Sequence, residues 1–200
     1  MTRKIGIFIY DQVEVLDFAG PFEVYVTASR VKLKKMPGAE VPFEVFTVAA
    51  QKKAVTARGG LMVTPTYGFG GHPMPDVVII PGGVIDGIES DPAILDWLKS
   101  VDRNSEITAS VCTGAFLLAK AGLLDDMPAT THWEDQADLK AMYPGIHVLK
   151  GKRWVDNGKV VTAGGISAGI SMSLHLVARL EDEGLAVATA RQMEFDWNPE

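Results

Sequence analysis

Residues 107–114 read Ile-Thr-Ala-Ser-Val-Cys-Thr-Gly, a run of small and apolar residues that leads directly into the apolar, helix-like segment Gly114–Leu124. Ile107–Val111 has the length of a strand buried on both faces, as the strands of parallel sheets are. Other apolar runs predict strands of the same kind, at Ile5–Tyr10, Phe43–Ala50 and Val77–Ile80.

Helices are predicted between and after these strands. Because proline favours the first position of a helix, a helix is expected to open at Gly20-Pro21. Further helices are predicted at Pro92–Ser100, Ile166–Leu180 and Leu185–Met193. Two antiparallel hairpins are predicted as additions to the sheet, Ala54–Tyr67 around Arg58-Gly59-Gly60 and Trp154–Val161 around Asp156-Asn157-Gly158. This alternation predicts an α/β sandwich, a mainly parallel sheet with helices on both faces, in a single domain of residues 1–200.

The composition excludes several classes of protein. The 200 residues are 47% hydrophobic and 22% charged, as in an ordinary globular chain. The only cysteine, Cys112, cannot form an internal disulfide. A net charge of −6 argues against a bulk nucleic-acid surface, and no apolar run reaches the roughly 20 residues of a membrane helix. Because Met1-Thr2-Arg3-Lys4 leads directly into a strand, no targeting segment is predicted, and we expect a cytoplasmic protein without nucleic-acid or membrane partners.

Three loops are candidates for a functional site. In open parallel sheets, ligands bind beyond the carboxyl ends of the strands. The first strand is followed by Asp11–Asp17, Val77–Ile80 by Pro81-Gly82-Gly83, and Ile107–Val111 by Cys112-Thr113-Gly114. If these strands are neighbours, the loops bring together a thiol, carboxylates and flexible backbone amides.

Cys112 has the sequence environment of a nucleophile on a sharp strand-to-helix turn. Such a turn needs small residues two positions to either side, and Ser110 and Gly114 occupy those positions. A cysteine there would lie at a helix N-terminus, which favours the thiolate, in a strained backbone conformation. The alternative is that Cys112 is only a small buried hydrophobic residue.

The acid and the amides each have a second interpretation. Asp17 could act in catalysis or could be a helix cap or a solvated loop acid, and Glu14 is an equally available carboxylate. Gly82 and Gly83 could offer backbone N–H groups to a developing anion, or Pro81-Gly82-Gly83 could be merely a turn.

Neither a metal nor another cofactor is predicted. The four histidines, His72, His132, His147 and His175, have no partner at metal-ligand spacing, and no phosphate-binding glycine motif is present. His175 is expected to be a core residue of an apolar helix. His132 follows the helix after Cys112 and could return to the site.

Taken together, these segments resemble the ThiJ/PfpI superfamily from Ile5 to about Arg191. The stretches that carry the resemblance are Ile5–Tyr10, Leu16–Pro21, Ile79–Gly83, Ser110–Gly114, Thr130-Thr131-His132-Trp133 and Ala163–Ile170. The resemblance implies a flavodoxin-like, class I glutamine amidotransferase-like sandwich with a functional cysteine at the turn, and it implies a homodimer.

Within that superfamily, the combination of Asp17 with Cys112-Thr113 resembles the one found in isocyanide hydratases. Protease-like members have histidine directly after the cysteine, where this chain has Thr113, and the stress-response branch has glutamate where this chain has Asp17. The likeness implies that Cys112 attacks an isocyanide to form a thioimidate, which water converts to an N-substituted formamide. Asp17 would move the protons, Thr113 would position it, Gly82 and Gly83 would hold charge or water, and Ile166 would wall the pocket.

Two other functions stay open at this point. One is a redox or carbonyl-stress protein of the deglycase or glyoxalase kind, in which Cys112 is oxidised or attacks a carbonyl compound. The other is a ligand-binding regulatory domain without turnover. The same domain occurs in AraC-type regulators, which continue into helix-turn-helix units, whereas this sequence ends at Glu200.

Overall fold

The computed structural model describes residues 1–198, whose centre is a mostly parallel sheet. Within those residues the sheet has seven strands, in the spatial order β10 (Trp154–Asp156), β11 (Val160–Ala163), β7 (Ile107–Val111), β6 (Val77–Ile80), β1 (Arg3–Phe8), β2 (Phe43–Ala49) and β5 (Tyr67–Gly68). Every neighbouring pair is parallel except β10 and β11. The predicted flavodoxin-like α/β fold is confirmed.

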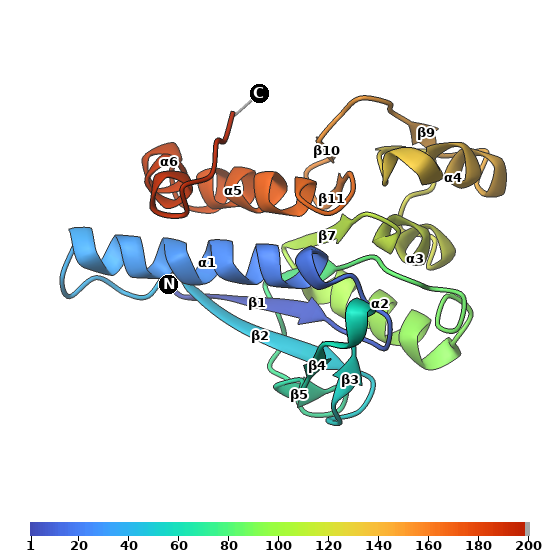
Figure 1. The fold of residues 1–200 in the computed structure, drawn as a ribbon, viewed down its shortest axis with the longest axis horizontal. Helices are drawn as coiled ribbons and strands as arrows, with labels where there is room; N and C mark the ends of the chain where they lie inside the picture. Colours follow the sequence, from blue (N-terminus) through green and yellow to red (C-terminus); the bar gives the residue numbers. More distant parts are fainter. Residues whose placement is uncertain (199–200) are drawn as a thin grey trace.

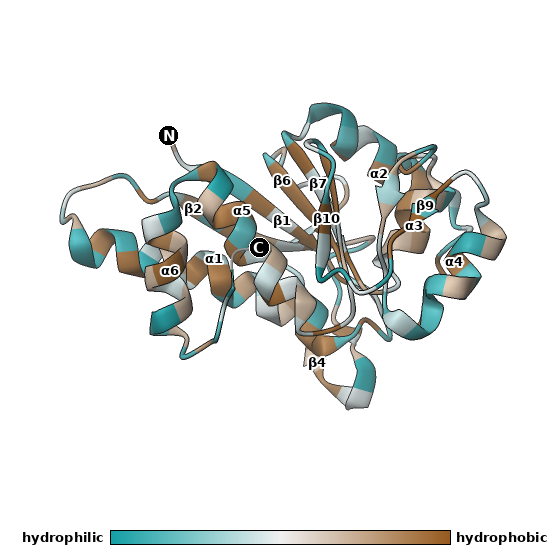
Figure 2. Ribbon diagram, turned by 90° about the horizontal axis from the view of Figure 1, so that it is seen from above, coloured by the Kyte–Doolittle hydropathy of each residue, from teal (hydrophilic) through white to brown (hydrophobic). Residues whose placement is uncertain are grey.

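Helices cover both faces of this sheet (Figures 1 and 2). One face carries α1 (Val15–Lys35), α5 (Ala168–Leu180) and α6 (Glu183–Gln192), and the other carries α2 (Pro92–Asn104), α3 (Gly114–Lys120) and α4 (Gln136–Met142). All four residues of β6 and all five of β7 are buried, because helices cover the sheet on either side. Their burial places the core along β1, β6 and β7.

The first helix begins earlier than the proline rule predicts. It starts at Val15, so Pro21 lies inside α1 instead of at its first position. A proline this near the start removes one backbone hydrogen bond, to the carbonyl of Asp17, and the packing of a 21-residue helix offsets that loss. The early start brings Asp17 into the first turn of the helix.

One of the two predicted hairpins is also placed differently. Trp154–Val161 forms β10 and β11 at the edge of the sheet, as predicted. In the other, β3 (Val55–Thr56) and β4 (Met62–Val63) pair only with each other around the 3-10 turn Arg58–Gly60, and Tyr67 continues into β5 as a parallel edge strand. Between α3 and β10, where the sequence patterns predict no elements, the structure has β8 (Pro128–Ala129), the 3-10 turn Trp133–Asp135, α4 and β9 (His147–Val148).

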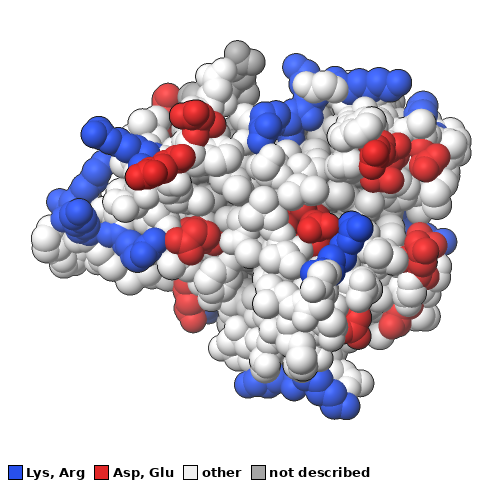
Figure 3. Space-filling model, viewed as in Figure 1, with Lys and Arg blue, Asp and Glu red and all other residues white. Residues whose placement is uncertain are grey.

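Charges of both signs are interspersed over the face seen in Figure 3. Lysine and arginine side chains project near the C-terminal end of α1 at the left, and acidic side chains lie among them and across the rest of the view. This face therefore presents no extended surface of a single sign. Within residues 1–198, no helix is long and apolar enough to cross a membrane.

Candidate functional site

The three candidate loops meet at the carboxyl edge of the sheet because β1, β6 and β7 are direct neighbours. The loop after β1 leads into the first turn of α1, which holds Asp17. The loop after β6 holds Gly82 and Gly83, and the turn after β7 holds Cys112 and Thr113. The topology thus brings the predicted thiol, acid and glycines to one place.

Cys112 adopts the strained backbone conformation that the sequence predicts. Its φ is +56°, in the left-handed region that residues with a side chain rarely adopt. The turn is held on both sides: the N–H of Cys112 donates to the carbonyl of Gly164 at 3.0 Å, and the Thr131 hydroxyl donates to the carbonyl of Cys112 at 2.7 Å. A Cβ at Gly114 would lie 2.1 Å from the carbonyl oxygen of Ile80, so only glycine fits there.

Asp17 is fully buried, and burial is the main reason its pKa is raised to about 7. Its Oδ2 accepts a hydrogen bond from the N–H of Gly82 at 3.0 Å, while Oδ1 makes no hydrogen bond with the described residues. The Cys112 thiol and the N–H of Ile166 also act on the carboxyl and lower its pKa, whereas the charge of Glu14 raises it. Near neutral pH, Asp17 can therefore either hold or accept a proton.

At Cys112, burial outweighs the effect of the helix N-terminus, which by itself favours the thiolate. The side chain is only 9% exposed, and burial, with the charge of Asp17, raises the pKa of the thiol to about 12. The N–H groups of Thr113 and Ile166 lower this pKa without cancelling the effect of burial. Above neutral pH, the favoured state of the pair is thus an Asp17 carboxylate beside a Cys112 thiol, with one proton on the two groups.

The two glycine amides are not free, contrary to the prediction for an anion-binding loop. The N–H of Gly82 is bound to Asp17, and the N–H of Gly83 donates to the Thr113 hydroxyl at 2.9 Å. That hydroxyl in turn donates to the carbonyl of Gly83 at 2.9 Å. Thr113 therefore connects the glycine loop to the cysteine turn, and its hydroxyl is bonded to Gly83 and not to Asp17. The amides that act on the thiol are instead those of Thr113 and Ile166.

Ile166 contributes its backbone as well as its side chain. Its φ is +51°, exceptional for a β-branched residue, and its side chain is 40% exposed. Its N–H acts on both Asp17 and Cys112. The sequence indicated a pocket wall and missed this donor, because the direction of a peptide N–H depends on backbone angles that no residue pattern specifies.

The two carboxylates that the sequence could not rank are clearly separated in the structure. Glu14 lies just before α1 and forms an ion pair with Arg58 at 3.1 Å. Asp17 has no basic partner among residues 1–198 and lies against the thiol. Of the histidines, His132 does return to the site and packs against Gly165, while His175 is not a core residue but pairs with Asp156 at 2.7 Å.

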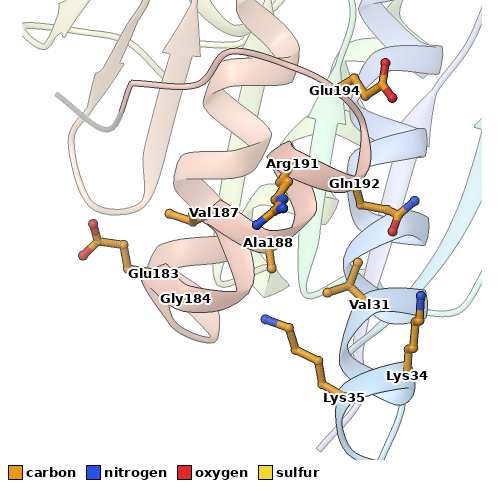
Figure 4. A pocket seen from close by; sticks show the side chains of 10 residues that line it. All are labelled: Val31, Lys34, Lys35, Glu183, Gly184, Val187, Ala188, Arg191, Gln192 and Glu194. Carbon is orange, nitrogen blue, oxygen red and sulfur yellow. The ribbon is translucent and has the colours of Figure 1, made fainter.

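The surface has a hollow near the thiol and a larger one away from it. A cavity of about 480 Å³ lies beside the cysteine turn. Its wall comprises Gly83, Val84, Ile85, Asp86, Glu89, Thr113, Phe116, Asp135, Asp138, Ala141 and Met142. A larger hollow, about 930 Å³, lies between α1 and α6 and contains none of the predicted site residues (Figure 4). Within residues 1–198 there is also no cluster of three or more residues suited to hold a metal ion.

Comparison with known proteins gives consistent matches along the chain. A model of the DJ-1/PfpI family matches residues 3–179. The isonitrile hydratase of Pseudomonas putida is 33% identical over 200 residues, which are 100% of this chain and 80% of that protein. The HTH-type transcriptional regulator GbdR of Pseudomonas aeruginosa is 26% identical over 97% of this chain, which spans only 51% of the regulator.

The fold has a close counterpart among solved structures. The crystal structure of a ThiJ/PfpI family protein from Pseudomonas syringae superposes with a TM-score of 0.85 at 28% identity. The superposition covers 100% of this chain and 77% of that one. These matches confirm the superfamily resemblance that the sequence motifs indicated.

Proposed function

The chain belongs to the DJ-1/PfpI family, and from that premise we propose that it hydrates isocyanides (isonitriles) to N-substituted formamides. One observation carries the proposal: a buried acid with a pKa of about 7 lies beside a buried thiol with a pKa of about 12. Such a pair keeps the thiol protonated until a substrate arrives and holds a base ready to remove that proton.

In the first half of the proposed reaction, the sulfur of Cys112 bonds to the terminal carbon of the isocyanide. The Asp17 carboxylate accepts the thiol proton as the bond forms and delivers it to the same carbon. The product is a thioimidate that contains all atoms of thiol and isocyanide. The N–H groups of Thr113 and Ile166 stabilise the negative charge on sulfur during this transfer.

In the second half, water adds to the thioimidate carbon. Asp17 takes a proton from the water and passes it to the substrate nitrogen. The carbon–sulfur bond then breaks, the new hydroxyl loses its proton through Asp17 to the departing sulfur, and the formamide leaves. The net change is isocyanide plus water to formamide, which needs neither a metal nor a redox cofactor.

The cavity beside Thr113 and Gly83 is the proposed site for the substituent of the isocyanide, since it opens next to the turn that carries the thiol. Its volume of about 480 Å³ suits a small organic group. We propose further that the protein acts as a homodimer, as the superfamily resemblance implies. We also propose that it acts in the cytoplasm, because a fold with one cysteine needs no oxidising compartment.

The decisive experiment incubates the purified protein with isocyanides of varied substituents and follows formamide by proton NMR. We expect turnover by the wild type and none by Cys112→Ala. If the folded wild-type protein forms no formamide from any isocyanide but converts a dicarbonyl compound, the hydratase proposal is wrong and the site acts on carbonyl compounds.

Ligand binding without turnover is the second candidate, because a transcriptional regulator matches 97% of this chain. The same samples distinguish it. Saturable, reversible binding of an isocyanide or a formamide without any product would favour the regulatory role. Steady formation of formamide would exclude a role limited to binding.

A further inference from the structure

The conformation of Ile166 needs a support that its own side chain does not supply. A β-branched residue at a φ of +51° carries backbone strain. The side chain is 40% exposed, so its burial does not compensate for the strain. Something in the surroundings must hold the Gly165–Ile166 peptide in the orientation that turns its N–H towards the site.

The ring of His132 occupies the space beside that peptide. A Cβ built on Gly165 would lie 1.9 Å from Cδ2 of His132, and 2.9 Å and 3.0 Å from Cγ and Nε2 of the same ring. Gly165 itself does not have the positive φ that would demand glycine. The position therefore excludes a side chain because His132 fills that space.

His132 is in turn fixed to the cysteine turn. Its Nδ1 lies 3.4 Å from Oδ2 of Asp135, which orients the ring. The preceding residue, Thr131, donates its hydroxyl to the carbonyl of Cys112 at 2.7 Å, and Gln136 donates its side-chain N–H to the carbonyl of Thr131 at 3.4 Å. The ring thus sits on a segment whose position is tied to the nucleophile.

We propose that His132 is a positioning residue, whose ring wedges against Gly165 and holds the Gly165–Ile166 peptide so that its N–H faces Asp17 and Cys112. Its importance for catalysis rests on the proposed isocyanide hydration. Its effect on the two site residues can be measured without any substrate, because loss of the Ile166 N–H removes a donor that lowers the pKa of both.

The first test replaces the ring. His132→Ala removes the wedge, and His132→Phe keeps a planar ring of similar size. The midpoint of Asp17 protonation is followed by the infrared band of its carboxylic acid, assigned by its absence in Asp17→Asn. For His132→Ala we expect a rise of about half a pH unit or more, with kcat lowered about tenfold and KM within about twofold. His132→Phe should restore both.

The second test uses the steric overlap between a side chain introduced at position 165 and the ring of His132. Gly165→Ala alone forces a methyl group into the ring of His132 and should shift the Asp17 midpoint and lower kcat. In Gly165→Ala/His132→Ala the methyl group occupies part of the space that the ring has left, so part of both losses should be recovered. Circular dichroism and thermal unfolding establish that each variant is folded.

Three outcomes would overturn the proposal. One is a folded His132→Ala protein whose Asp17 midpoint and kcat equal those of the wild type. Another is a folded His132→Phe protein as impaired as His132→Ala. The third is simple additivity of the two alanine substitutions. If the wild type hydrates no isocyanide, the proposed function fails, whereas the Asp17 midpoints still decide the role of His132.

Discussion

Oδ2 of Asp17 accepts a hydrogen bond from the backbone N–H of Gly82 at 3.0 Å, across 65 positions of sequence. The bond fixes the acid of α1 against the loop after β6 and leaves Oδ1 without a hydrogen bond to the described residues. Oδ1 is therefore the oxygen available to exchange a proton with Cys112. The expected effects of substituting Asp17 depend on this arrangement and on the burial that accompanies it.

Asp17→Asn should keep the fold and abolish hydration, because an amide cannot accept and return a proton. A loss of roughly 100-fold to 10,000-fold in kcat is the usual scale for a general acid or base. The pKa of the Cys112 thiol should fall, since the charge of Asp17 contributes to raising it. Formamide production measures the first effect, and the pH dependence of alkylation of the only cysteine measures the second.

Glu14→Gln is the matched control for that substitution. Glu14 is three residues away and pairs with Arg58 instead of the thiol, so its loss should leave most of the activity. If Asp17→Asn retains the wild-type rate and Glu14→Gln loses it, the assignment of the acid is reversed.

Stability should fall as the pH rises from about 4 to about 7. The pKa of Asp17 is raised from 3.8 to about 7 in the folded protein, so the folded state holds a proton that the unfolded state releases in this range. Asp17→Asn stays neutral and escapes the effect. We expect it to be more stable than the wild type by about 2–4 kcal/mol at pH 8, with little difference at pH 4. Urea denaturation at the two pH values tests this, and equal stability at pH 8 would contradict it.

Gly114→Ala should destabilise the protein because its new methyl group would lie 2.1 Å from the carbonyl oxygen of Ile80. Overpacking of this kind typically costs about 1–3 kcal/mol. Gly87→Ala is the control, since a Cβ at Gly87 meets nothing within 4 Å and Gly87 has no positive φ. Thermal unfolding of the two variants should show a clear loss for the first and almost none for the second.

Isocyanides with an anionic substituent should be poor substrates. The ionisable side chains in the wall of the proposed substituent cavity are all acidic: Asp86, Glu89, Asp135 and Asp138. Like charges repel in a partly desolvated cavity, so KM should rise for a carboxylate substituent relative to a neutral or ammonium one of equal size. The replacement of Asp138 by asparagine should narrow this difference, and equal KM values for the three substituents in the wild type would refute the assignment of the cavity.

The sequence alone determined the strands at the centre of the parallel sheet, β1, β2, β6 and β7, and the position of the cysteine turn. Val77–Ile80 is wholly apolar, and Ile107–Val111 combines apolar residues with the small Thr108 and Ser110, as suits strands buried between two helix layers. Gly114 beside Cys112 marks a turn in which the backbone passes close to another strand. These signals can be recognised in short stretches of sequence, although the contact that requires glycine at position 114 is with Ile80 of β6.

Only the tertiary structure decided the chemical state of the site. Asp17 and Glu14 are both acids in the same loop region, and what separates them is that one is buried against the thiol while the other meets Arg58 from a distant segment. The amides of Gly82 and Gly83 are occupied by Asp17 and Thr113, and the backbone N–H groups that act on the thiol are those of Thr113 and Ile166. Burial, charge and hydrogen bonding are set by groups brought together from across the chain, so a pKa and a free donor are properties of the packed molecule.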